Sequence, residues 1–125
     1  MLRTLIIEDN DSFRHSLQEV LLGYFPCMVI EEAGDGIDAL DKMARHVPQL
    51  IFMDIKLPGI SGLDLTRTIR SQHADIVIAV ITAYDIPEYR QAALESGANY
   101  FLPKSSTSGS NLFAMVDNAF PAVCD

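Results

Sequence analysis

The chain has 125 residues, of which 49% are hydrophobic and 21% charged, so it is long enough for one folded core and too apolar for a disordered segment. Its 17 acidic and 9 basic residues give a formal net charge of −8, which disfavours direct binding to nucleic acid or to an anionic membrane surface. No apolar run approaches the ~20 residues of a membrane-spanning helix, and the short apolar start before Glu8 does not fit a signal peptide. We therefore expect a cytoplasmic protein that binds neither nucleic acid nor a membrane.

Short apolar runs alternate with stretches of helical periodicity along the chain. The runs lie at residues 5–7, 28–30, 50–53, 76–81 and 100–102, and they lack the polar alternation of half-exposed strands. The helical stretches are carried by residues 13–24, by Ile37, Leu40, Ala44 and Val47, by residues 63–70 and 88–95, and by residues 112–120. This order predicts an α/β doubly wound domain: a five-stranded parallel sheet flanked by five helices.

Polar side chains stand directly after four of the five predicted strands. Glu8 and Asp9 follow the first run, Asp54 the third and Thr82 the fourth, and Lys104 follows the fifth after one proline. The carboxyl ends of parallel strands meet at one edge of the sheet, where open α/β sheets bind their ligands. We therefore expect three carboxylates, one hydroxyl and one ammonium to converge there.

The residue types in this group suit phosphoryl chemistry. Three crowded carboxylates repel one another unless a cation lies between them, and hard oxygen ligands favour Mg²⁺ or Mn²⁺. Asp54 can act as a nucleophile, because carboxylates form acyl-phosphates. The cation and Lys104 would neutralise phosphoryl oxygens, and Thr82 would hydrogen-bond a third oxygen.

Taken together, these motifs resemble the receiver domain of two-component response regulators over essentially the whole chain. They are the acidic pair Glu8 and Asp9, Asp54 within residues 52–59, the Thr82-Ala83 pair and Lys104 after residues 100–103, with a glycine-containing loop at 59–62. Each motif alone is weak evidence, but all of them in this order are specific. The resemblance implies the flavodoxin-like strand order 2-1-3-4-5 and a single receiver domain spanning residues 1–125.

The resemblance also implies a role for each carboxylate. Asp54 takes the position of the phospho-acceptor, which receives a phosphoryl group from a histidine kinase. Glu8, Asp9 and Asp54 take the positions of the Mg²⁺ ligands, together with the backbone carbonyl of Lys56. Thr82 corresponds to the switch hydroxyl that moves toward the phosphate.

Further positions follow from the same comparison. Lys104 corresponds to the lysine that pairs with the aspartyl-phosphate, and Phe101 to the switch aromatic that turns inward, although Phe101 equally fits a static core residue. Lys56 and Tyr84 occupy the two variable positions that tune the lifetime of the phosphoryl group. Ser105 stands where the family often has a proline, which leaves the geometry of the loop after the fifth strand open.

The resemblance implies three kinds of partner. A histidine kinase would donate the phosphoryl group, and an attached output domain or a separate effector protein would read the change, for example in the control of transcription. The family often uses the fourth helix, fifth strand and fifth helix as a partner or dimer face, which here corresponds roughly to residues 87–97, 100–102 and 110–120.

Two other functions compete with this interpretation. A phosphorylation-independent interaction domain could share the fold, but the complete set of polar residues argues against it. A Mg²⁺-dependent phosphatase with an aspartate nucleophile would need a second aspartate where Lys56 stands. We therefore predict no enzymatic activity beyond self-catalysed phosphorylation and dephosphorylation. The two cysteines, Cys27 and Cys124, lie far apart and lack metal-ligand spacing, so we predict free thiols.

Overall fold

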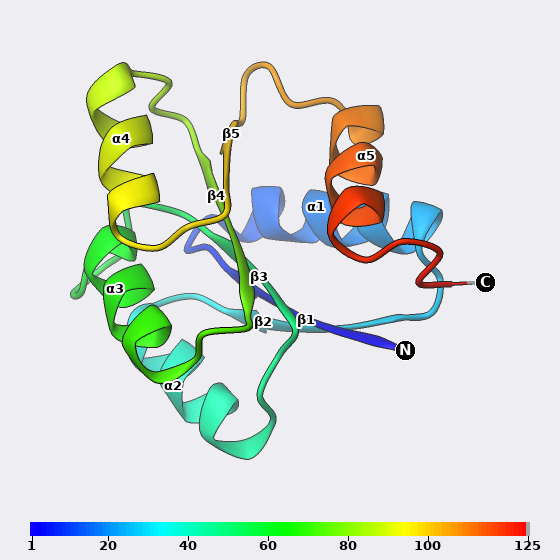
Figure 1. Ribbon diagram of the computed structural model, residues 1–125, viewed down its shortest axis with the longest axis horizontal. Helices are drawn as coiled ribbons and strands as arrows, with labels where there is room; N and C mark the ends of the chain where they lie inside the picture. The colour runs from blue at the N-terminus through cyan, green and yellow to red at the C-terminus, as the bar shows by residue number, and fades with distance from the viewer. Residues whose placement is uncertain (125) are drawn as a thin grey trace.

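The computed structural model describes residues 1–124, and it arranges them as a central sheet between two layers of helices (Figure 1). The described residues form five parallel strands: β1 (Leu2–Ile7), β2 (Met28–Ala33), β3 (Leu50–Met53), β4 (Val77–Thr82) and β5 (Tyr100–Pro103). Their order is β2-β1-β3-β4-β5, as predicted. β5 is an edge strand, which explains why it tolerates Pro103.

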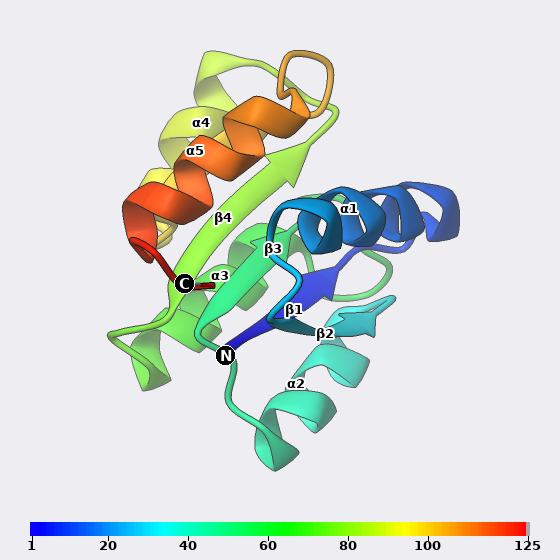
Figure 2. The same ribbon diagram turned by 90° about the vertical axis from the view of Figure 1, so that its right-hand side faces the viewer.

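The five helices divide between the two faces of the sheet. They are α1 (Asp11–Tyr24), α2 (Gly36–Arg45), α3 (Gly62–Gln72), α4 (Pro87–Glu95) and α5 (Gly109–Ala119). Helices α1 and α5 cover one face, and α2, α3 and α4 cover the other (Figures 1 and 2). None of the helices within residues 1–124 has the length and apolar character needed to cross a membrane.

Successive side chains of the central strands pack into two separate hydrophobic cores, one on each face of the sheet. In β3, Leu50 and Phe52 belong to the core beneath α1 and α5, whereas Ile51 and Met53 belong to the core beneath α2, α3 and α4. All four side chains are fully buried. A strand that is covered on both faces has no polar side, so the continuous apolar run predicted it correctly.

The second helix buries a different face from the one the sequence indicated. The predicted stripe contained Ile37, Leu40 and Val47, but Ile37 is 81% exposed and Val47 lies beyond the helix and is 53% exposed. The buried residues of the helix are Gly36, Ala39 and Met43. A Cβ on Gly36 would lie 2.2 Å from Ile60 Cγ2, so this position on the buried face requires a small residue, and the most apolar stripe is not the buried one.

The prediction of free cysteines is wrong. Cys27 lies in the loop between α1 and β2, Cys124 lies beyond α5, and the two form a disulfide with a Cα–Cα distance of 5.6 Å. Their separation of 97 residues hides this proximity in the sequence. They meet because α1 and α5 pack side by side on the same face of the sheet and end on the same side (Figure 2).

Gly62, the first residue of α3, lies against the backbone that follows β3. Ser61 caps α3 by accepting a hydrogen bond from the amide of Asp64 at 3.1 Å, and the Gly62 amide donates to the carbonyl of Ile55 at 2.8 Å. A Cβ atom on Gly62 would lie 1.9 Å from the backbone oxygen of Asp54. Because backbone atoms cannot move aside without distorting the loop, this position requires glycine.

Two glycine-to-alanine substitutions should therefore have opposite effects on stability. Gly62→Ala should lower the free energy of unfolding by roughly 2–3 kcal/mol, because its Cβ overlaps the backbone of Asp54. Gly23→Ala, in α1 with nothing within 4 Å of the added Cβ, should raise it by about 0.5–1 kcal/mol. Urea unfolding of both variants measures the difference, and equal effects would contradict this account of Gly62.

Candidate functional site

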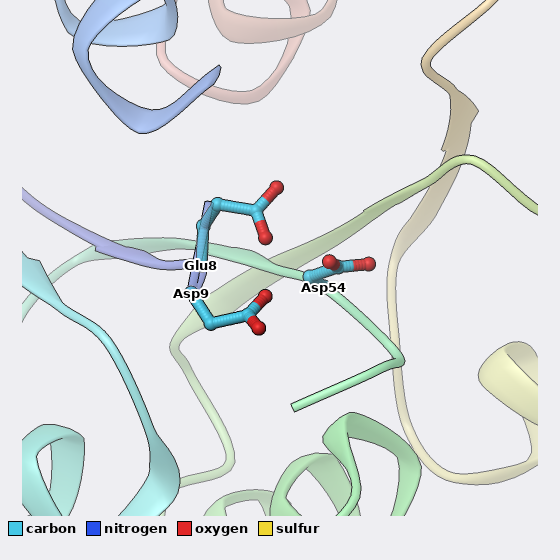
Figure 3. Close-up of side chains that lie close together, drawn as sticks. All are labelled: Glu8, Asp9 and Asp54. Carbon is cyan, nitrogen blue, oxygen red and sulfur yellow. The ribbon is translucent and has the colours of Figure 1, made fainter. Parts of the chain in front are cut away.

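Three carboxylates meet at the carboxyl edge of the sheet. Glu8 and Asp9 follow β1, Asp54 follows β3, and one carboxylate oxygen from each lies within 4.8 Å of the other two. The side chains of Glu8 and Asp9 extend from the end of β1 toward Asp54 (Figure 3). Glu8 is 1% exposed and Asp54 6% exposed, whereas Asp9 is exposed. This cluster could hold a metal ion, as the sequence predicted.

The sheet ladder continues one residue past the strands and fixes the two buried carboxylates. The amide of Glu8 donates to the carbonyl of Ala33 at 2.9 Å, and the amide of Asp54 donates to the carbonyl of Ile7 at 3.0 Å. Each acidic residue is therefore held to a neighbouring strand by its own backbone. The close spacing of their side chains follows from strand register rather than from a flexible loop.

Lys104 places an ammonium among the carboxylates. Its Nζ contacts Glu8 Oε1 and lies 3.6 Å from Asp54 Oδ2, and the side chain is 18% exposed. The ammonium also lies 4.0 Å from the centroid of the Phe13 ring on α1, within the range of a cation–π interaction. The Lys104 amide donates to the carbonyl of Thr82 at 2.7 Å, which anchors the start of the loop after β5.

Burial and crowding change the ionisation of Glu8. Burial raises the pKa of Glu8 above its ordinary value, and its side-chain hydrogen bond with Asp54 raises it further. Lys104 acts in the opposite direction by stabilising the carboxylate. The raised pKa indicates that the single ammonium does not offset the desolvation and crowding of these carboxylates. A divalent cation would supply the missing positive charge.

Thr82 and the residue two positions later lie at the end of β4. Thr82 is completely buried, and its hydroxyl oxygen accepts a hydrogen bond from the Tyr84 amide at 3.2 Å. Tyr84 is exposed, and the Nζ of Lys56 lies 5.2 Å from the Tyr84 ring centroid and 5.5 Å from that of Tyr89. A hydrogen bond to Tyr89 raises the pKa of Lys56. The ammonium of Lys56 thus lies against two aromatic rings.

Phe101 is buried in β5 beneath α4. It is 7% exposed and belongs to the same core cluster as Ala93 of α4. The guanidinium of Arg90 covers the ring at 4.8 Å from its centroid. The ring therefore points inward in this structure, an arrangement in which a side chain of α4 holds it.

Arg14, which no sequence motif singled out, fixes the backbone beside the cluster. Its guanidinium donates to the Glu8 carbonyl oxygen at 2.7 Å, to Glu32 at 3.0 Å and to Asp11 at 2.7 Å. A basic residue so close to the start of a helix opposes the helix dipole, so its position was a signal that it serves another purpose.

Phe13 and Tyr89 were not predicted as site residues either. Phe13 contacts Lys104, and Tyr89 contacts Lys56.

The loop after β5 closes without the proline that the family often carries. The amides of Ser106 and Thr107 donate to the carbonyl of Pro103 at 3.2 and 3.0 Å, which forms a tight turn. Lys104 and Ser105 lie within this turn. The turn therefore holds Lys104 beside the acidic cluster with serine as the following residue.

The response regulator receiver domain model matches residues 4–117, which include the three carboxylates, Thr82 and Lys104. The chain belongs to the response regulator receiver domain family. This result confirms the resemblance drawn from the strand-end residues. Receiver domains are response regulators rather than classical enzymes.

Relatives and solved structures support the same assignment. The receiver is 37% identical over 102 residues to response regulator MprA of Mycobacterium sp. (strain KMS), an alignment that covers 82% of this chain and 44% of that protein. A putative response regulator from Chloroflexus aurantiacus J-10-fl is 30% identical, with a TM-score of 0.85 over 94% of this chain and 96% of the other. The receiver thus spans less than half of the length of the curated relatives that it matches.

A third similarity concerns the fold alone. The signal receiver domain of a DNA-binding response regulator from Colwellia psychrerythraea 34H is 23% identical, with a TM-score of 0.88 over 94% of this chain and 97% of the other. Together these similarities establish the CheY-like flavodoxin fold of the receiver.

Removing one charge from the cluster should stabilise the metal-free protein. The pKa of Glu8 is higher in the folded protein than its ordinary value of 4.5, so the folded protein loses stability as the pH rises above 4.5 and Glu8 ionises. At pH 7, ionised Glu8 therefore lowers the free energy of unfolding. Asp54→Asn should relieve this crowding and raise that free energy by about 1 kcal/mol in the presence of EDTA. Thermal and urea unfolding at pH 7 provide the measurement.

The matched control is Asp75→Asn, which removes an exposed acid far from the cluster. It removes one negative charge, as Asp54→Asn does, and should change the stability by less than about 0.5 kcal/mol. Equal effects of the two substitutions would show that the gain reflects net charge rather than crowding at the cluster.

Proposed function

We propose that this receiver is a phospho-accepting signalling switch that takes a phosphoryl group onto Asp54 in the presence of Mg²⁺. The observation that carries the proposal is the packing of Glu8, Asp9 and Asp54 within 4.8 Å, with the Lys104 ammonium against two of them. The cluster combines a nucleophilic carboxylate, ligands for a hard cation and a separate positive charge. Phosphoryl transfer depends on positioning and charge neutralisation, which this set supplies.

In the proposed reaction, an oxygen of the Asp54 carboxylate forms a bond to phosphorus. The P–N bond of the donor phosphohistidine breaks, and its electron pair returns to the imidazole. Glu8, Asp9, Asp54 and the backbone carbonyl of Lys56 would hold Mg²⁺, which neutralises phosphoryl oxygens when bound. Mn²⁺ would fit the same oxygen ligands.

Lys104 and Thr82 would recognise the product. The Lys104 ammonium, which now contacts Glu8 and approaches Asp54, would pair with a phosphoryl oxygen. The Thr82 hydroxyl accepts from the Tyr84 amide, so its own proton is available to donate to another oxygen. Movement of Thr82 would change the packing around Phe101 on the neighbouring strand, and Arg90 of α4 would respond because it covers that ring.

Lys56 and Tyr84 are proposed to set how long the phosphoryl group lasts. Lys56 lies against Tyr84 and Tyr89 rather than against the carboxylates, so the two tuning positions form one contact beside the site. Together with Tyr89, this contact would control the access of water to the phosphoryl group.

The proposed donor is a histidine kinase, and the proposed reader is an attached output module or a separate effector, for example one that controls transcription. The face formed by α4, β5 and α5 is the proposed partner or homodimer surface, and it includes the exposed Leu94 and the hydrogen bond between Asn118 and Tyr100. We propose a cytoplasmic location and one receiver unit over residues 1–125, which itself contacts neither DNA nor a membrane.

The direct experiment is phosphorylation by a small donor. Incubation with Mg²⁺ and acetyl phosphate should add one phosphoryl group per chain, as measured by intact mass. Asp54→Asn should abolish the gain, whereas Asp75→Asn should retain it because this residue is exposed and remote from the cluster. The absence of a mass gain, or a gain that persists in Asp54→Asn, would overturn the proposal. If fluoroberyllate with Mg²⁺ also changed no amide resonance, an interaction domain independent of phosphorylation would be favoured.

A substitution of Lys104 should separate metal binding from phosphoryl transfer. Lys104→Met removes a positive charge from the cluster, so Mg²⁺ should bind several-fold more tightly, as measured by a titration of thermal stability. The same substitution should slow phosphorylation by acetyl phosphate about 10²-fold, because one group that neutralises the phosphoryl oxygens is lost.

Lys42→Met is the matched control, since Lys42 contacts Asp38 and the Glu32 carbonyl but not the three carboxylates. It should change neither the Mg²⁺ affinity nor the rate of phosphorylation beyond twofold. A fall of both quantities in Lys104→Met would instead indicate that Lys104 supports the structure of the cluster as a whole.

A further inference from the structure

A disulfide joins the loop after α1 to the segment after α5. Cys27 and Cys124 are both half-buried, and the described residues contain no other cysteine. Cys27 immediately precedes Met28, which pairs with Leu2 at the amino end of the sheet. The acidic cluster lies at the carboxyl end, beyond Ile7 and Ala33, so the six-residue strands separate the two sites by roughly 17–20 Å.

Besides the disulfide, residues 120–124 after α5 make few contacts with the rest of the described chain. Helix α5 ends at Ala119, and the Phe120 amide closes the last turn by donating to the carbonyl of Val116 at 2.8 Å. The next two residues, at positions 121 and 122, are exposed, and Val123 is only partly buried against the core beneath α1 and α5. Cys124 packs against the same core, and the Val123 carbonyl oxygen lies 3.5 Å from Cys27 Sγ. The covalent bond at Cys124 is the strongest of these restraints on residues 121–124.

The helices do not depend on this bond for their packing. The rings of Phe25 and Phe113 stack at a centroid distance of 5.3 Å, and Tyr24 packs against Phe113 at the same distance. These contacts join the end of α1 to α5 directly, independently of the disulfide. Loss of the bond should therefore free the terminal segment while α5 stays in place.

We propose that Cys27 and Cys124 form a reversible redox modification site whose oxidation clamps residues 121–124 against the base of α1. Its oxidant is a low-molecular-weight disulfide. The thiolate of one cysteine attacks this disulfide, forms a mixed disulfide and expels one thiolate, which takes up a proton. The second cysteine thiolate then attacks the protein sulfur and expels the second thiol.

Two protein thiols become one protein disulfide, and the small disulfide receives the two electrons and leaves as two thiols. The reverse exchange opens the clamp. Partial exposure of both cysteines gives the small thiol or disulfide access to the bond in either direction.

The redox state then determines the direction that residues 121–124 take after the end of α5. In the oxidised form, residues 121–124 are held beside Cys27 and follow the base of α1. In the reduced form, only the partly buried side chains of Val123 and Cys124 and the contact of the Val123 carbonyl with Cys27 hold them, so the segment can adopt other directions. This device does not involve the acidic cluster, so it does not rest on the proposed phosphorylation.

The test uses the wild-type chain equilibrated in buffers that span a range of reduced and oxidised glutathione. Thiols are trapped with N-ethylmaleimide under denaturing conditions and counted by intact mass. We expect one intramolecular two-electron transition, in which both thiols disappear together. The oxidised form should melt about 5–15 °C above the reduced form. Its amides at residues 120 and 122–124 should exchange hydrogen at least 10-fold more slowly.

Cys27→Ser and Cys124→Ser are the matched controls. Each should show the fast exchange of the reduced wild type in every buffer, because neither can close the clamp. The proposal is overturned if both thiols remain alkylatable at every glutathione ratio, or if mixed disulfides or covalent dimers are the main oxidised products. It is also overturned if amide exchange at residues 120 and 122–124 is the same in both redox states of the wild type.

Discussion

The mutual repulsion of three carboxylates is the constraint on which the functional edge of this receiver depends. Glu8 and Asp54 are almost completely buried, Asp9 stands beside them, and one ammonium reaches this group from β5. Such a cluster persists without a bound cation only if the backbone forces it. The hydrogen bonds from the Glu8 and Asp54 amides to neighbouring strands supply that force. The folding energy of the sheet thus maintains a site that by itself would disperse.

Neighbouring residues hold the acidic cluster in position. Arg14 donates to the backbone carbonyl of Glu8 rather than to its carboxylate, so it fixes the position of Glu8 without neutralising it. The ring of Phe13 contacts the ammonium of Lys104 in a cation–π interaction. Gly62 lets α3 begin against the backbone of Asp54. The first turns of α1 and α3 therefore brace the acidic residues, which leaves their oxygens available to a cation.

The strand-end residues could be predicted from the sequence because the geometry of a parallel sheet decides where they meet. Once the apolar runs are recognised as buried strands, Asp54 and Lys104 must lie on one edge, although 50 residues separate them. The register in which β1, β3 and β5 lie leaves little freedom at that edge. Prediction succeeded where the backbone alone determines proximity.

Prediction failed where proximity depends on how side chains pack. The apolar stripe of Ile37, Leu40 and Val47 indicated the buried face of α2, but the residues that the helix buries are Gly36, Ala39 and Met43. The pairing of Cys27 with Cys124 depends on where α1 and α5 end relative to each other, which no local pattern encodes. The role of Arg14 depends on three partners from different elements.

Helix α5 connects the two ends of the molecule. Its first turn follows the loop that carries Lys104, and its last turn leads to the disulfide with Cys27. Packing of Phe113 on Phe25 ties the helix to α1 between these two points. A change in the position of Lys104 would reach the start of α5 through the loop after β5, whereas a change at Cys124 would move only residues 121–124, because aromatic contacts hold the helix itself in place. Because these two changes lie at opposite ends of α5, a partner that contacts both the start of the helix and residues 121–124 would respond to both without any direct contact between the acidic cluster and the cysteines.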